Sequence, residues 1–161
     1  MKHTLPGKAV SLISLLLVLL LLCSCRKSAA QNPADLVSQI KSQSTFTELS
    51  ALSGDKLSSY FQFRDTDVKR FSALISVSGE SADTIAVFEV TDKSQYDLVI
   101  TGITQYLTNL SSSFRNTMEG EYKKVQNRVL VQMDQVIILV ICSDSATIEK
   151  HLTGRGAKLI Y

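Results

Sequence analysis

The stretch Val136-Ile-Ile-Leu-Val-Ile-Cys142 decides the fold of this chain, because it is an unbroken run of apolar residues. Such a run has no polar face to turn toward water, and is typical of a strand buried in the middle of a sheet. Just before it, Val129, Val131 and Met133 alternate along a second apolar stretch. Asp134-Gln135 separates the two stretches, which predicts an antiparallel hairpin.

An earlier part of the chain predicts a second hairpin. Apolar residues alternate with serines over residues 71–77, which is the period of a half-buried strand. The loop-forming residues 79–83 follow, and then the apolar stretch Thr84–Val90. Within this stretch, Ile85, Val87 and Phe88 indicate a strand that is buried on both faces.

A long helix is predicted between the hairpins and a shorter one after them. Asp92 and Gln95 resemble a capping box. Apolar side chains then follow the three- and four-residue spacing of a helix from Tyr96 to Phe114. Residues 119–126 are predicted as a further helical turn or an ordered loop. The last helix is expected to be capped by Ser143 or Asp144 and to end at about Leu152.

Short helices are predicted at the start of the folded region. Asn32-Pro33 is an N-cap followed by proline, which predicts a helix to about Ser42. Two further helical stretches are predicted around Phe46–Leu52 and Asp55–Tyr60. At the other end of the chain, Lys158–Tyr161 is predicted to add an edge strand.

Together these elements predict a single α+β domain over residues 34–161. After the short N-terminal helices, their order is strand, strand, helix, strand, strand, helix (ββαββα). Two hairpins then form a four-stranded antiparallel sheet with helices on one face, which is a two-layer sandwich.

Residues 1–24 have the three parts of an export signal. Lys2 and Lys8 make a positive start, and Ala9–Leu22 is apolar apart from two serines. Ser24 is the small residue that ends the segment. The apolar run is shorter than the roughly 20 residues of a permanent membrane-spanning helix. A removable signal peptide is therefore favoured over an uncleaved anchor.

The motif Leu22-Cys23-Ser24-Cys25 resembles the lipobox of bacterial lipoproteins. By this resemblance, Cys25 receives a diacylglycerol thioether and becomes the first residue of the mature protein. Cys23 is the poorer candidate because the bulky Leu22 precedes it. Residues 25–33 then form the lipidated cysteine and a short tether, so we expect a domain held on the extracytoplasmic face of the cell membrane.

Removal of residues 1–24 leaves a chain without net charge. Lys2 and Lys8 are lost and no acidic residue is, so the 17 basic residues become 15, equal to the 15 acidic ones. Such a chain lacks the positive field that nucleic acids require, and no nucleic-acid partner is expected. Cys142 is then the one cysteine besides Cys25, and its apolar neighbours favour a buried core residue over a nucleophile.

No motif of a known catalytic or cofactor site occurs in the sequence. We therefore expect no catalytic residue, no cofactor and no bound metal. For an enzyme whose site is unrecognised and built from carboxylates and hydroxyls, the nearest candidates are Asp65, Asp67 and Glu89.

Three charged features have a structural and a functional interpretation. In the functional interpretation, Asp65-Thr66-Asp67 supplies two oxygen ligands of a calcium site. A capped turn is favoured, because the sequence lacks the downstream ligands of a calcium-binding loop. Lys123, Lys124 and Arg128 form a small basic cluster, for which a solvated face is favoured over a site for anionic lipid or polymer. His151 is expected to complement the carbonyl end of the last helix.

A family resemblance covers Ala34 to about Leu152. It rests on Leu57-Ser-Ser-Tyr60 with Asp67-Val68, on Ala82–Val90 with Asp92, and on the apolar strand before Cys142-Ser-Asp144. In these stretches the chain resembles the small bacterial lipoproteins of the domain-of-unknown-function family four-three-five-eight (DUF4358). The resemblance implies a lipoprotein location and this fold, and no reaction, because the family has no assigned activity. Some members are thought to sit beside membrane acyltransferases of envelope polymers.

Two functions are compatible with the sequence. The favoured one is a non-catalytic accessory or binding module of the cell envelope, anchored to the membrane through the lipid on Cys25, with an envelope protein or polymer as its partner. The alternative is an extracytoplasmic enzyme that acts on envelope sugars or esters.

Overall fold

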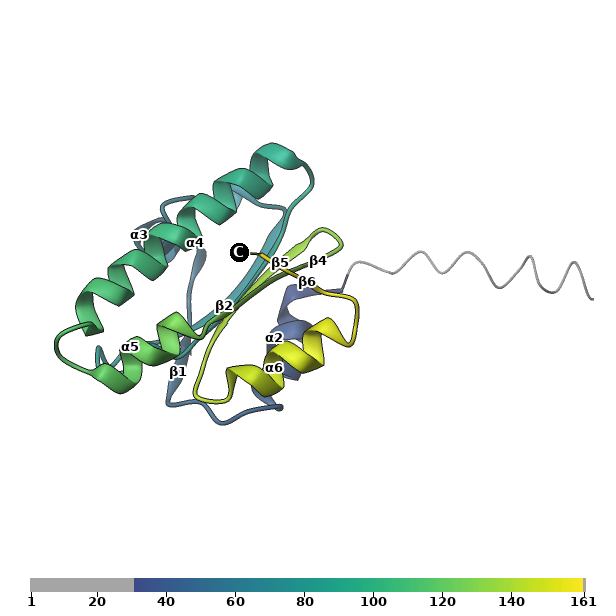
Figure 1. Cartoon of the computed structure of the whole chain (residues 1–161). Coiled ribbons are helices and arrows are strands. Elements are labelled where there is room, and N and C mark those ends of the chain that lie inside the picture. The colour runs from purple at the N-terminus through teal and green to yellow at the C-terminus, as the bar shows by residue number, and fades with distance from the viewer. Residues whose placement is uncertain (1–30, 161) are drawn as a thin grey trace, which may run out of the picture. The chain divides into compact units, whose positions relative to one another are not determined.

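Two antiparallel hairpins, β2–β3 and β4–β5, form the centre of the sheet (Figure 1). The computed structural model describes residues 31–160. The hairpins join because β3 pairs antiparallel with β5, with Thr84 opposite Ile141 and Glu89 opposite Val136. Both predicted hairpins are therefore confirmed. The strands are β2 (Arg70–Ser76), β3 (Thr84–Glu89), β4 (Val129–Met133) and β5 (Val136–Ile141).

Two short edge strands extend the sheet to six strands, in the order β1-β2-β3-β5-β4-β6. β1 (Leu49–Ala51) pairs with β2, and β6 (Lys158–Leu159) pairs with β4, as predicted for the tail. The predicted four-stranded sheet is wrong because the segment 46–52, which was expected to be helical, contains β1. This strand is specified by the free edge of β2, a partner that exists only once the sheet has formed.

Helices cover both faces of the sheet, so the domain has three layers (Figure 1). α2 and α6 lie on one face, and α3, α4 and α5 lie on the other. The α+β class is confirmed, and the two-layer sandwich with helices on one face is wrong. The helices are α2 (Pro33–Lys41), α3 (Gly54–Phe61), α4 (Lys93–Phe114), α5 (Glu119–Gln126) and α6 (Ser145–Thr153), with a short 3₁₀ turn, η1 (Asp65–Asp67), before β2.

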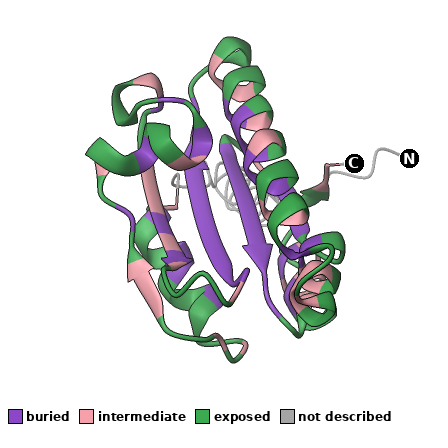
Figure 2. Cartoon of the chain, turned by 90° about the vertical axis from the view of Figure 1, so that its left-hand side faces the viewer, coloured by how far each residue is buried: buried purple, intermediate pink, exposed green. Residues whose placement is uncertain are grey.

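The domain has a third layer because its two central strands, β3 and β5, are apolar on both faces. Every residue of β3 and β5 is buried, as Figure 2 shows for the middle of the sheet. Successive side chains of a strand point to opposite faces. Ile85 and Val87 of β3 therefore join the core with Leu36 of α2, while Ala86 and Phe88 join the core with α3 and α4. A strand that is apolar on both sides needs a helical layer on each side.

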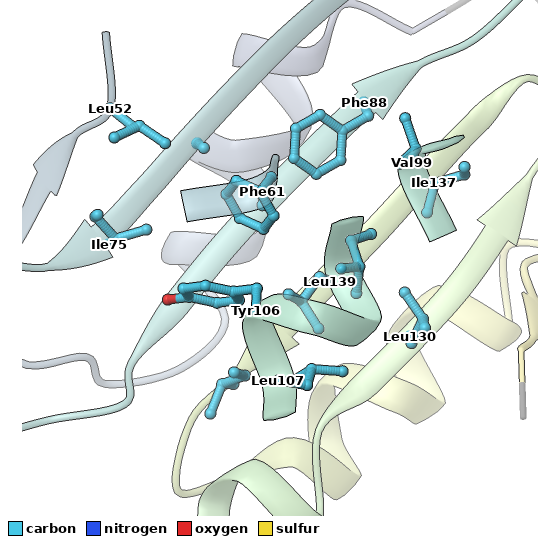
Figure 3. Close-up of a cluster of buried hydrophobic side chains, with 14 of the residues drawn as sticks. Leu52, Phe61, Ile75, Phe88, Val99, Tyr106, Leu107, Leu130, Ile137 and Leu139 are labelled. Carbon is cyan, nitrogen blue, oxygen red and sulfur yellow. The ribbon is translucent and has the colours of Figure 1, made fainter. Parts of the chain in front are cut away.

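Aromatic rings fill the core between the sheet and α4 (Figure 3). Phe61 lies between Phe88 and Tyr106, and its ring centroid is 5.2 Å and 4.7 Å from theirs. The Tyr106 hydroxyl lies 2.8 Å from the Thr84 hydroxyl, so its polar end is satisfied inside the core. Burial raises the pKa of Tyr106 to about 12, and the phenol therefore stays protonated at physiological pH.

Side-chain caps begin three of the helices at the predicted residues. Asn32, Asp92 and Asp144 each accept a hydrogen bond from a backbone N–H in the first turn of α2, α4 and α6, respectively. The Gln95 side chain also points back, and its Oε1 accepts a hydrogen bond from the N–H of Thr91 at 2.9 Å. The predicted capping box therefore reaches one residue further upstream than the sequence pattern specifies.

α4 passes so close to the end of α3 that only glycine fits at position 102. A Cβ atom there would stand 2.0 Å from the carbonyl oxygen of Phe61 and 2.7 Å from a ring carbon of Phe63. Glycine in the middle of a helix weakens it by up to about 1 kcal/mol relative to alanine. In α4 this weakness is tolerated because it allows the two helices to pack closely.

Gly102→Ala is expected to lower the free energy of unfolding by about 1–3 kcal/mol, because the added methyl group forces the backbone of α3 away. Gly120→Ala is the matched control, since a Cβ at position 120 meets no atom within 4 Å. The control is expected to keep or slightly increase stability. Urea unfolding followed by circular dichroism measures both variants, and a wild-type midpoint for Gly102→Ala would contradict the close approach.

Candidate functional site

A polar groove opens between the segment after α2 and the end of β5. Residues 42–47 form one wall and Ser143 and Asp144 form the other, around a space of about 660 Å³. Hydroxyl groups predominate, with one amide from Gln43 and one aromatic ring from Phe46. We call this space the hydroxyl groove. Its many donors and acceptors, beside one apolar ring, suit a polar ligand.

Asp83 holds one wall of the hydroxyl groove from inside the protein. Its side chain is almost completely buried, and its Oδ2 accepts a hydrogen bond from the N–H of Thr47 at 2.7 Å. Its Oδ1 accepts a hydrogen bond from Lys124 Nζ at 2.9 Å. Ser81 Oγ accepts hydrogen bonds from the N–H of Asp83 and the hydroxyl of Thr47. These bonds tie the segment 42–47 to the start of β3.

Lys124 joins Asp83 to a second carboxylate. Its Nζ lies 2.9 Å from Glu121 Oε1, and Glu121 Oε2 accepts a hydrogen bond from the N–H of Ala82 at 2.8 Å. Burial acts to lower the pKa of Lys124, but hydrogen bonds to Asp83 and Glu121 outweigh it, and the pKa is raised above its ordinary value. The ammonium group therefore remains charged at neutral pH and connects α5 to β3.

Cys142 lies behind the hydroxyl groove and has a weak polar contact with it. The Ser44 hydroxyl donates to Cys142 Sγ at 3.9 Å. The cysteine is 1% exposed, and burial raises the pKa of its thiol. A buried thiol that keeps its proton is a poor nucleophile, so the geometry agrees with the predicted role as a core residue.

Glu89, at the far end of β3 from Asp83, is a second buried carboxylate. Its side chain is fully buried, and its two oxygens accept hydrogen bonds from Arg70 Nε at 2.5 Å and Lys69 Nζ at 2.7 Å. The hydrogen bond from Arg70, supported by Lys69, lowers the pKa of Glu89 despite burial. Lys69 and Arg70 therefore both form ion pairs with Glu89 at the end of β3.

The three candidate acids of the enzyme alternative do not share one cluster. Asp67 accepts hydrogen bonds from the backbone and side chain of Arg64, and Asp65 accepts one from the N–H of Thr66. No hydrogen bond between described residues joins either acid to Glu89. The capped turn predicted here is confirmed as η1. Residues 31–160 contain no group of metal-ligating side chains that would hold a calcium ion.

The three residues of the predicted basic cluster have different partners in the structure. Lys123 pairs with Glu119 on the surface of α5 at 2.7 Å, whereas Lys124 turns inward to Asp83. Arg128 donates to the carbonyl oxygen of Gln126 at 3.3 Å. Of the three cations, therefore, only Lys123 and Arg128 face solvent.

Sequence reasoning missed the hydroxyl groove and the network behind it. One signal was present: residues 42–47 combine serines and threonines with one phenylalanine, as polar binding loops do. Asp83 also directly precedes an apolar strand, where an unpaired charge would be costly. The predicted signal peptide of residues 1–24, the predicted lipid-attachment residue Cys25 and the first residues of the predicted tether lie outside the described part of the chain.

The fold and the groove define a three-layer α+β domain with a polar surface cleft. A family profile described as a domain of unknown function (DUF4358) matches residues 42–142, and the chain belongs to this family. No curated protein and no solved structure matches the chain. Among the described helices, none has the length and apolar character needed to span a membrane.

Glu89→Gln is expected to remove part of the acid sensitivity of the fold. The pKa of Glu89 is lowered in the folded protein, so its ion pairs stabilise fully above the ordinary value of 4.5 and are lost as the pH falls through the lower folded value. At pH 7 the variant is expected to lose about 1–3 kcal/mol, and this difference should shrink below pH 4.5.

Urea unfolding of both proteins between pH 7 and pH 3 measures this difference. Glu119→Gln is the matched control, because Glu119 pairs with Lys123 at the surface and water screens the pair. A gap between wild type and Glu89→Gln that stays constant with pH would contradict the ionised state of Glu89.

Proposed function

We propose that this protein is an extracytoplasmic lipoprotein, anchored through Cys25, that serves the cell envelope as a non-catalytic accessory or binding module. Its hydroxyl groove holds the partner. One observation carries the proposal: the reactive groups next to the groove are already engaged in structure, while the groove itself is rich in hydrogen-bonding groups.

The engaged groups surround the groove. Asp83 is shared between Lys124 and the backbone of Thr47, and Cys142 keeps its proton. Asp144 caps α6 by accepting a hydrogen bond from the N–H of Thr147 at 3.4 Å. General acid–base or nucleophilic catalysis needs a group that is free to exchange a proton or attack a substrate. Hydroxyls and amides instead support recognition.

The partner is expected to be polar and close to the membrane. Residues 26–32 reach at most about 25 Å when extended, so a domain tethered at Cys25 works near the bilayer. An envelope polymer rich in hydroxyls, or a polar protein segment, would form hydrogen bonds with the groove walls and pack on Phe46. The groove therefore fits either class of envelope partner.

The alternative, an enzyme acting on envelope sugars or esters, has less support. Asp65 and Asp67 hold the turn η1, and Glu89 is enclosed by Lys69 and Arg70. An acid and a base that cooperate on one substrate must lie on either side of it. The positions of these carboxylates supply no such pair.

Cys25→Ala is expected to abolish lipid attachment and signal cleavage. Expressed in a bacterium, the wild type should fractionate with membranes and have the mass of a lipid-bearing chain that starts at residue 25. Cys23→Ala is the matched control and should behave as the wild type, because the lipid is attached at Cys25. Secretion of the wild type without lipid would contradict the anchor.

Photo-crosslinking tests the hydroxyl groove in intact envelopes. A photoreactive amino acid at Thr45, in the groove, is expected to yield an adduct whose mass identifies a glycan or a peptide. The control carries the same amino acid at Lys150, which is exposed on α6 and does not line the groove. Equal labelling from both positions would contradict a specific site.

A further inference from the structure

A second groove, of about 470 Å³, lies between α4, α5 and the start of β4. Arg115, at the end of α4, and Arg128, just before β4, both line it. Among the described residues that line it, none has a carboxylate side chain. We call it the arginine groove. In Figure 1, α5 lies beside the C-terminal half of α4.

Both guanidinium groups are positioned without being neutralised. Arg115 lies over the ring of Tyr122, with its Cζ 5.6 Å from the ring centroid. Arg128 donates to the carbonyl oxygen of Gln126. Neither arginine forms an ion pair within residues 31–160. The cations that do pair with carboxylates there are Arg64, Lys69, Arg70, Lys93, Lys123 and Lys124.

Apart from the two arginines, the described residues that line the arginine groove have uncharged hydroxyl, amide and apolar side chains. The hydroxyls of Thr104, Thr108 and Ser112 on α4 donate to backbone carbonyls one turn earlier, so their protons are already used. Of the apolar lining residues, Val125 and Leu130 are buried, while Ile100 and Ile160 are partly exposed. Among the described lining residues, the two arginines are the only charged groups, so they are the main attraction for an anionic ligand.

Two arginines without carboxylate partners suit phosphate better than other anions. Each guanidinium offers a planar fork of N–H donors that matches two phosphate oxygens. The two positive charges also balance the charge of about −1.5 to −2 on a phosphate monoester, or that of two successive phosphodiesters. Because both arginines are exposed, a single contact is weak, and a repeating ligand gains from several contacts along the groove.

We propose that Arg115 and Arg128 form a binding subsite for the phosphate groups of an anionic polymer. The subsite is independent of the hydroxyl groove and of the lipid anchor, because neither contributes a residue to it. It provides a localised positive site on the surface of the domain.

Titration of the purified full-length protein in neutral detergent with long-chain inorganic polyphosphate tests the subsite. The double variant Arg115→Gln/Arg128→Gln is expected to bind about tenfold more weakly than the wild type. Lys41→Gln/Lys150→Gln removes the same charge from exposed positions outside the groove and is the matched control. It is expected to stay within about threefold of the wild type.

Equal losses in the two double variants, or wild-type affinity in the arginine variant, would overturn the proposal. For the wild type alone, affinity is expected to fall steeply as the salt concentration rises. A third arm measures how binding to vesicles depends on their phosphatidylglycerol content. If the arginines affect only this dependence, and soluble polyphosphate does not bind, the groove recognises lipid headgroups and the proposal is wrong.

Discussion

The pairing of β3 with β5 is the contact on which the rest of the structure depends. Both strands are buried along their whole length, so neither tolerates an edge position or a face in water. Each strand has one partner in its own hairpin and needs a second to satisfy its backbone. Joining the hairpins through β3 and β5 supplies this partner for both. The helical layers on the two faces then bury the side chains that alternate along these strands.

Ion pairs to two buried carboxylates close β3 at both ends and connect this pairing to the hydroxyl groove. Asp83 stands just before the strand and meets Lys124 of α5, while Glu89 ends the strand between Lys69 and Arg70. Removing one partner of a buried ion pair leaves an uncompensated charge that costs several kcal/mol. These pairs therefore favour one position of α5 and one register of β2. The same Asp83 holds Thr47, so the wall of the hydroxyl groove is set by the end of the central strand.

The two grooves lie in different helical layers and have different chemistry. The hydroxyl groove, beside α2 and α6, offers mainly uncharged donors and acceptors. The arginine groove, beside α4 and α5, contains two cations and, among the described residues that line it, no carboxylate side chain. The domain has a localised positive site there because its ion pairs are unevenly distributed. Lys124 and Arg128 belong to the same basic cluster in the sequence, but Lys124 turns inward to Asp83, whereas Arg128 stays exposed at the surface.

The sequence by itself determined the elements whose signals are local. The apolar runs specified β3 and β5, and the capping residues Asn32, Asp92 and Asp144 marked where helices begin. Only the tertiary structure decided that the domain has a third layer, that the strand β1 forms and that position 102 needs glycine. It also decided which groups bind Asp83. Each of these depends on a contact between segments far apart in the chain, which periodicity along one segment does not encode. The candidate site belongs to this second group because its walls come from residues 42–47 and 143–144, which meet only when the sheet is complete.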